Sequence, residues 1–357
     1  MSLTEEIIRR LNPPAKVSGI VSYLWSKMGR EGRLAVAALT GLLFPFLVQN
    51  PYYLRLGTLA GLYVLLSLGL NVVVGLAGLL DLGYIAFYAV GAYTYALLAS
   101  PHFGWHLSFW VVLPLAALLA AGTGILLGFP SLRLKGDYLA IVTLGFGEII
   151  RILLVNLDRP INITNGPNGL LRIDPPVFLG VPLVQPRQLF LLVWAFAALA
   201  ILFSQRLAGS YIGRAWRALK EDETVASFQG INPTWYKLQA FAVGAFLAGL
   251  AGVFFAAWQG AVFPQNFTLA EVITIFAMVI LGGSGNVLGV VAGAIILTVL
   301  PEALRQYSVY RMLIYGLALV LLIRFRPEGL WPAVNGERLD LARPENTGLA
   351  VRRVWPG

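Results

Sequence analysis

Residues 56–77 read LGTLAGLYVLLSLGLNVVVGLA, a run without a single charged side chain. About 20 apolar residues are enough for a helix to cross the hydrocarbon core of a bilayer. Because lipid offers no water to the backbone, a spanning segment of this kind must satisfy its own hydrogen bonds, which a helix does. The segment therefore predicts a transmembrane helix.

The same pattern recurs along the chain, which has 357 residues, 58% of them hydrophobic and 12% charged. A soluble domain carries about 25% charged residues, so this composition excludes a soluble enzyme, a disordered protein and a nucleic-acid-binding module. The apolar runs are continuous and do not alternate with polar residues, which favours helices over membrane strands. We expect an all-α polytopic membrane helix bundle of about ten transmembrane helices. The expected spans are 34–48, 56–77, 82–98, 109–129, 138–157, 189–203, 238–258, 269–281, 287–300 and 307–323.

The basic residues predict how this bundle is oriented. With the N-terminus inside and ten spans, nineteen of the 26 Lys and Arg residues fall in inside segments and far fewer in outside segments. This positive-inside bias predicts that both termini are cytoplasmic and accounts for the net charge of +9 without a nucleic-acid partner. The domains expected are a cytoplasmic segment 1–33, a transmembrane domain 34–323 and a cytoplasmic tail 324–357. An eight-span alternative, with 269–300 as a re-entrant hairpin, gives the same bias.

Several polar or glycine-rich features interrupt the apolar segments. Glu148 and Arg151 lie three positions apart within one span, where an ion pair offsets part of the cost of burying charge. Breaks occur at 75–78, followed by Asp81, and at 282–286, which contains Gly282, Gly283 and Asn286. Broken helices often line the substrate route of transporters, so these residues are candidates for the translocation path or its gate. The alternatives are a structural ion pair and ordinary tight turns.

The carboxylates of Asp81 and Glu271 are expected at span ends, where water or headgroups can reach them.

The sequence predicts neither a catalytic site nor a cofactor. It has no cysteine, no GxSxG or HExxH motif, and no GxxxxGK[ST] loop with which to hydrolyse ATP. His102 and His106 are four positions apart, but they lie in a connection with Pro101 and Gly104, where membrane-edge residues are expected more often than a metal pair. No metal site is predicted.

The loop at 209–233 is expected on the cytoplasmic side. Residues 214–229 are compatible with a helix, Gly230 is at a position typical of a helix end, and Pro233 blocks continuation. The acidic trio Glu221-Asp222-Glu223 is expected to begin a second short turn. A short helix with charged residues at one end and small residues on one face is suited to bind in a groove of another protein. The alternative is a helix lying on membrane lipid.

Four segments and this loop together resemble one family. The segments are GLAGLLDLGYIAFYAVGAYTYALL (75–98), LKGDYLAIVTLGFGEIIRILL (134–154), FAVGAFLAGLAGVFFA (241–256) and AMVILGGSGNVLGVVAGAIILTVLPEALR (277–305). They look like the LivM-type permease of branched-chain amino-acid ABC importers. Two positions depart from the family pattern: Asn165 stands where a glycine is expected, and Ser227 where a second alanine is usual.

The resemblance implies a permease subunit for branched-chain, neutral and apolar amino acids in the bacterial cytoplasmic (inner) membrane. Its implied partners are a LivH-type permease, two cytoplasmic ABC ATPases and an external solute-binding protein. It also implies the large-importer (type II-like) architecture, in which this chain forms half of the pathway. The loop 209–233 would be the coupling helix, with the ATPase joint formed by Arg214, Arg217, Glu221, Asp222, Glu223, Ala226 and Gly230.

One rival function is a stand-alone ion-coupled transporter that uses Glu148, Asp81 or Glu271 as a proton or sodium site. It leaves the acidic inside loop unexplained. A non-transporting scaffold is disfavoured by the broken helices.

Overall fold

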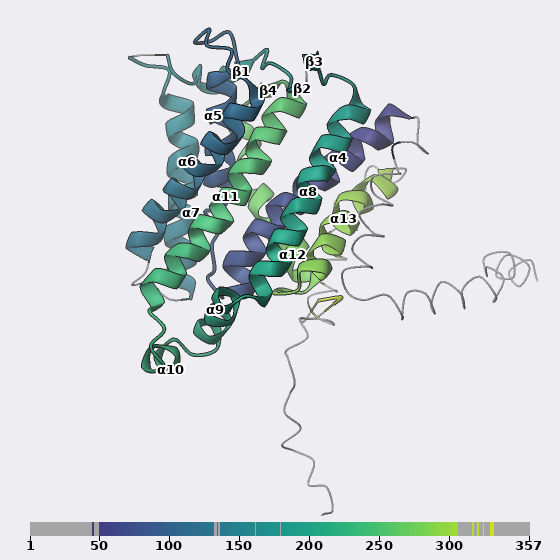
Figure 1. Cartoon of the computed structure of the whole chain (residues 1–357). Helices are drawn as coiled ribbons and strands as arrows, with labels where there is room; N and C mark the ends of the chain where they lie inside the picture. Colours follow the sequence, from purple (N-terminus) through teal and green to yellow (C-terminus); the bar gives the residue numbers. More distant parts are fainter. Residues whose placement is uncertain are drawn as a thin grey trace, which may run out of the picture.

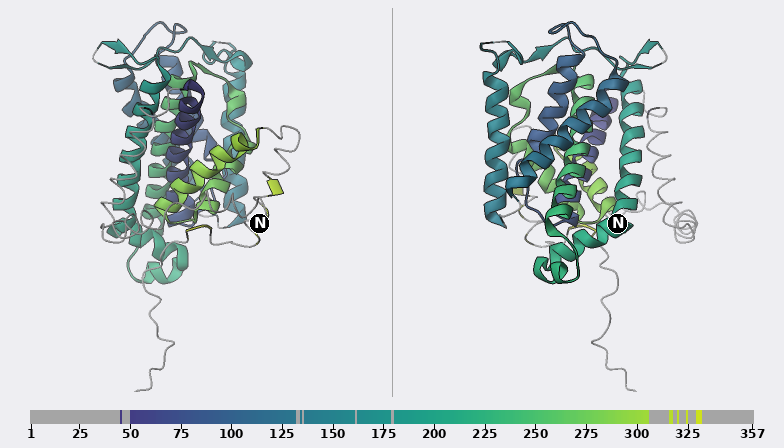
Figure 2. Two further views of the ribbon diagram at one scale, coloured as in Figure 1. Left: turned by 90° about the vertical axis from the view of Figure 1, so that its right-hand side faces the viewer. Right: turned by 60° about the vertical axis from the view of Figure 1, so that its left-hand side comes forward.

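The computed structural model describes residues 50–131, 134, 136–160, 162–178 and 180–305, with isolated positions at 45, 316, 317, 320, 324 and 329–331. The expected spans 34–48 and 307–323, the segment 1–33 and nearly all of the tail 324–357 lie outside the described residues. The described part is a bundle of long helices running between two ends, one bearing short strands and the other bearing helices α9 and α10 (Figure 1). Two further views show the same two ends (Figure 2).

Every expected span within the described part is helical. The helices are α4 (Pro51–Leu70, continued by a π-helical turn at Asn71–Leu76), α5 (Ile85–Leu98), α6 (Phe109–Ser131), α7 (Asp137–Asn156), α8 (Pro186–Gly209), α11 (Pro233–Gln259), α12 (Leu269–Gly282) and α13 (Val287–Ala303). Six segments are long and apolar enough to cross a membrane, α12 being counted together with the short 3-10 turn before it as Pro264–Gly282, whereas α5 and α13 are shorter. The prediction of a multi-pass helical membrane protein is confirmed.

Helices α8 and α11 extend further than their apolar runs indicated. Helix α8 continues to Gly209 instead of ending at Phe203, and α11 begins at Pro233 instead of Leu238. Asn232 caps α11 by accepting a hydrogen bond from the Trp235 amide at 3.3 Å, and Pro233 at the first helical position needs no partner for its nitrogen. Local capping therefore lengthens a helix beyond the part that hydropathy identifies.

Helix α11 lies at the centre and packs against α4, α5 and α6. Small residues make this packing close: a Cβ atom at Gly91 of α5 would collide with the backbone of Gly249 on α11. In lipid, helices gain little from burying apolar surface, so close van der Waals packing of this kind holds them together.

The end opposite α9 and α10 carries two small two-stranded sheets. Strand β1 (Leu170–Leu171) pairs antiparallel with β4 (Ala261–Val262), and β2 (Val177–Phe178) pairs with β3 (Val181–Pro182). Asn165 precedes them with a φ of +59°, a left-handed conformation that asparagine tolerates better than most residues. Its side-chain nitrogen donates to the Gly169 carbonyl at 2.9 Å. The substitution of an expected glycine by asparagine is thus compatible with the backbone.

Candidate functional site

The loop between α8 and α11 folds as two short helices, α9 (Tyr211–Glu221) and α10 (Glu223–Phe228), separated at Asp222. The Asp222 carboxylate accepts hydrogen bonds from the amides of Thr224 at 2.7 Å and Val225 at 3.0 Å, which caps α10. Helix α10 ends before Gly230, whose φ is +84°. The second short turn that the acidic trio is expected to begin is present as α10, which starts at Glu223.

Buried contacts fix these helices to the bundle. Trp216 of α9 is fully buried, and its indole N–H donates to the Tyr236 carbonyl of α11 at 2.7 Å. Lys237 of α11 lies 2.8 Å from Glu223, and only 9% of the lysine side chain is exposed. A buried ammonium must be paired to be tolerated, so this ion pair holds α10 at a defined position beside α11.

Arg214 and Arg217 bond within their own chain. Arg214 donates to the Gly209 carbonyl at 3.2 Å, and Arg217 donates to the Ala208 carbonyl at 3.0 Å. Both acceptors lie in the last turn of α8, where cations satisfy free carbonyls and complement the helix dipole. These arginines therefore brace the junction between α8 and α9.

The apolar surface of α10 is formed by two residues. Phe228 is 86% exposed and Val225 is 52% exposed, whereas Ala226 is buried. Glu221, the last residue of α9, is exposed as well. Large apolar side chains that gather in water-facing loops mark interaction surfaces. We call Val225, Phe228 and Glu221 the α10 surface.

Lys220 joins α9 to the first glycine break. Its ammonium donates to the Gly75 carbonyl at 2.8 Å, and its stem covers Gly78, where a Cβ atom would lie 2.6 Å from Lys220 Cγ. Gly75 lies in the π-helical turn that ends α4, a place where carbonyls lack amide donors from a following turn. Burial lowers the pKa of Lys220, and neighbouring Glu221 partly opposes this effect.

The two glycine breaks are in contact with each other. The side-chain oxygen of Asn71, in the π-helical turn, accepts a hydrogen bond from the Gly285 amide at 2.8 Å. A Cβ atom at Gly75 would collide with both of these groups. Helix α9 and the breaks at 75–78 and 282–286 thus form one contiguous unit, in which π-helical geometry typical of functional sites lies at the centre.

The break at 282–286 has the geometry of a tight hairpin between α12 and α13. Gly283 and Gly285 have φ values of +105° and +89°, which favour glycine. Asn286 caps α13 by accepting from the Leu288 amide at 3.1 Å. A Cβ atom at Gly282 would collide with the Gly289 backbone.

Asp81 is completely buried, contrary to the expectation that water or headgroups reach it. Its Oδ1 accepts from the Gly83 amide at 2.9 Å, whereas Oδ2 has no hydrogen-bond partner among the described residues. The reason is that residues 77–84 do not form an open turn: Tyr84 beside it is buried and donates to the Leu66 carbonyl of α4 at 2.9 Å.

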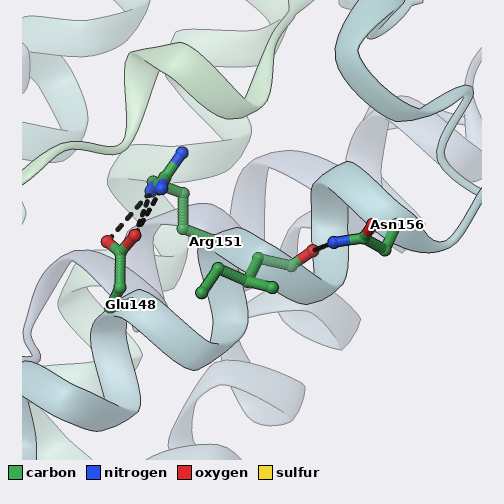
Figure 3. Close-up of polar contacts among 4 residues, drawn as sticks. Glu148, Arg151 and Asn156 are labelled. Atoms are coloured by element: carbon green, nitrogen blue, oxygen red, sulfur yellow. Dashed lines mark hydrogen bonds and ion pairs between the residues drawn. The ribbon is translucent and has the colours of Figure 1, made fainter.

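Glu148 and Arg151 pair on the open face of α7, and two of the bonds, from Arg151 Nε to the carboxylate oxygens, measure 2.9 and 3.0 Å (Figure 3). Their side chains remain 48% and 31% exposed. Helix α7 is the least buried of the six long apolar helices in the described part. Since charges do not face lipid readily, this face requires protein or water beside it.

The two histidines have separate partners at the strand-bearing end. His106 Nδ1 lies 2.6 Å from an Asp174 carboxylate oxygen, and His102 Nε2 lies 3.0 Å from the Asn162 carbonyl. No group of three or more metal-ligating side chains occurs among the described residues.

Comparison with known proteins decides the family. Residues 52–323 match the family described as branched-chain amino acid transport system / permease component. This chain belongs to that family. The high-affinity branched-chain amino acid transport system permease protein LivM of Escherichia coli is 45% identical over 312 residues, which cover 81% of this chain and 72% of the relative. The protein of the same name from Salmonella typhimurium is 44% identical with the same coverage.

A more distant relative is the probable branched-chain amino acid transport permease protein LivM of Methanocaldococcus jannaschii. It is 28% identical over 242 residues, covering 62% of this chain and 68% of the relative. No solved structure matches at a significant level. With six long apolar helices among the residues that the structure describes, the chain is a multi-pass permease of the inner membrane.

The described structure of this permease adds residues that the sequence alone did not single out. Lys220, Lys237 and Phe228 carry the contacts or exposure described above, whereas the predicted joint residue Ala226 is buried. The exposure of Phe228 could have been predicted from the sequence, because Phe228 lies two positions before the expected helix end in a loop outside the apolar spans. No sequence pattern indicated the hydrogen-bond partners of Lys220 and Lys237, because each contact depends on how the helices pack against one another.

Proposed function

We propose that this permease is the membrane subunit of an ATP-driven importer for branched-chain amino acids. It pairs with a LivH-type permease, forms half of the pathway in a large-importer (type II-like) architecture, and receives substrate from an external solute-binding protein. Two cytoplasmic ATPase subunits drive the importer, and the loop 209–233 is the coupling helix that seats in a groove of one of them. The relatives named for branched-chain amino acid transport support the substrate class.

The proposed topology keeps ten spans, with both termini and the loop 209–233 in the cytoplasm. Segments 1–33 and 324–357 flank the transmembrane domain 34–323. The bias of Lys and Arg supports this orientation.

The α10 surface is the observation that carries the proposal. Exposed Phe228 and Val225 give the α10 surface its apolar side chains. The Glu223–Lys237 ion pair and the buried Trp216 hold α10 and α9 firmly against α11. Because α10 is rigidly attached to α11, a movement of a docked ATPase would be transmitted to the membrane helices, as alternating access requires. In this arrangement Arg214, Arg217, Glu223 and Asp222 shape the joint, and Glu221 and Phe228 contact the partner.

The experiment compares two phenylalanines at opposite ends of the bundle. Phe228→Asp should abolish co-purification of the ATPase subunits and ATP-driven uptake of leucine. The control, Phe178→Asp, alters a side chain that is 51% exposed at the strand-bearing end and should leave co-purification of the ATPase subunits unchanged. Undiminished ATPase binding by the Phe228 variant would contradict the docking site.

The buried carboxyl of Asp81 and the cavity-lining carboxyl of Glu271 favour one second candidate, an ion-coupled transporter that works without ATPases. It predicts leucine uptake by the isolated permease in liposomes with a proton or sodium gradient. ATP-dependent uptake that is insensitive to both gradients supports the importer instead.

A further inference from the structure

A cavity of about 200 Å³ lies inside the bundle between α4, α5, α11 and the start of α12. A water molecule occupies about 30 Å³ in the liquid, so the cavity has room for one small solute. It is separate from the α10 surface and from the glycine breaks. Its lining combines a carboxylate, aromatic faces and an apolar wall.

The carboxylate belongs to Glu271 in the first turn of α12. Its Oε1 accepts a hydrogen bond from the Tyr63 hydroxyl at 2.8 Å. None of the described residues that line the cavity is a lysine, arginine or histidine, so no cation of the lining neutralises this carboxylate. A carboxylate that is partly removed from water is costly unless it is paired, and a ligand with a positive charge would provide the pairing.

Aromatic rings provide a second feature for a cation. Tyr88 of α5 and Phe255 of α11 both line the cavity, and their ring centroids are 5.4 Å apart. Ring faces attract ammonium groups, most strongly where water is excluded. Glu271 and these two rings therefore define a cation-binding end.

The remaining walls suit the other groups of an amino acid. Leu59, Leu62 and Leu66 are spaced three and four positions apart, which places them on one face of α4, and all three line the cavity. Asn266 uses its side-chain oxygen to accept from the Phe263 amide at 3.0 Å, which leaves its amide nitrogen as a donor for a carboxylate. A bare metal cation would use neither the leucines nor this donor.

We propose that this cavity binds one neutral α-amino acid with a branched apolar side chain. Glu271 and the two rings hold its ammonium group, Asn266 donates to its carboxylate, and the leucines of α4 contact its side chain. This site rests on the proposed function and deepens it, because it gives the permease a substrate site of its own.

The test measures equilibrium binding of radiolabelled leucine to the assembled permease–ATPase complex in nanodiscs, without the solute-binding protein. We expect saturable binding that falls at least tenfold in Glu271→Gln and is unchanged in the control Glu302→Gln, which removes a carboxylate from α13 outside the cavity. Leu59→Phe should lower binding as well, because it fills the cavity and leaves the charge in place.

Competition identifies the group that Glu271 recognises. Unlabelled 3-methylbutylamine retains the ammonium and should compete, whereas 4-methylpentanoate lacks it and should not. Absent binding, wild-type affinity in both the Glu271 and Leu59 variants, or equal competition by the two analogues would overturn the site. ATP-driven uptake by the wild-type complex with its solute-binding protein is measured in parallel. Uptake without leucine binding overturns only the cavity, whereas absent uptake contradicts the proposed function.

Discussion

The ammonium of Lys220 donates to the carbonyl of Gly75 at 2.8 Å, a bond between residues 145 positions apart in the chain. It connects helix α9 to the π-helical end of α4, and Asn71 in the same turn bonds to Gly285 in the second glycine break. Movement of α9 would therefore reach both breaks through two hydrogen bonds. A hydrogen bond with a charged partner contributes about 1.5–3 kcal/mol, enough to bias a two-state equilibrium substantially.

Replacing Lys220 by methionine should separate ATP hydrolysis from transport. Methionine keeps an apolar stem over Gly78 but removes the donor to Gly75. We expect the ATPase rate of the assembled complex to persist and the leucine taken up per ATP hydrolysed to fall by about tenfold, as follows from losing a bond worth about 1.4 kcal/mol or more. Lys220→Arg, which retains a donor, is the matched control. An unchanged uptake ratio in the methionine variant would show that this bond does not carry the coupling.

The burial of Lys220 also leads us to expect that the leucine taken up per ATP hydrolysed depends on pH. Burial lowers its pKa, so Lys220 loses its proton at a lower pH than an exposed lysine does. As pH rises through this lowered pKa, the charged donor is lost and the uptake per ATP should decline. Arginine stays protonated throughout, so Lys220→Arg should remove this decline. The ratio is the quantity to measure, because the pH dependence of the ATPases affects both of its terms. Identical pH profiles for the two proteins would refute this assignment.

Hydropathy alone predicted the eight apolar helices in the described part, α4 to α8 and α11 to α13, since each depends on a local run of apolar residues. The turn at Asp222 was also predictable, because a cap acts on amides two and three positions away. The bond from Lys220 to Gly75 was not, because it depends on the way α9 packs under α4. Asp81 was wrongly expected to reach water for the same reason: only the packing of residues 77–84 buries it. Charge and glycine patterns located the candidate segments, but not which of them are in contact.

Gly78 and Gly104 offer a matched test of the contact with Lys220. Both have a φ of +70°, so alanine causes the same backbone strain at each, about 1 kcal/mol or more. At Gly78 the new methyl group would lie 2.6 Å from Lys220 Cγ, whereas at Gly104 nothing lies within 4 Å. We expect Gly78→Ala to lower both the thermal stability of the complex and the uptake per ATP. Gly104→Ala should lower stability slightly and leave coupling intact. Equal coupling in both variants would show that α9 tolerates displacement from the break.

The Glu148–Arg151 pair on α7 predicts an outcome that depends on charge balance. Each single change, Glu148→Gln or Arg151→Gln, leaves one uncompensated charge on a face of a membrane helix, which costs about 2.5–3.5 kcal/mol at mid-bilayer on insertion scales. Both single variants should therefore reduce assembly with the partner permease, measured by co-purification. The exchanged variant, Glu148→Arg with Arg151→Glu, restores a pair three positions apart on the same face. Recovered assembly with recovered uptake would assign the pair a structural role. Recovered assembly without uptake would place these two side chains on the substrate path, where the position of each charge matters.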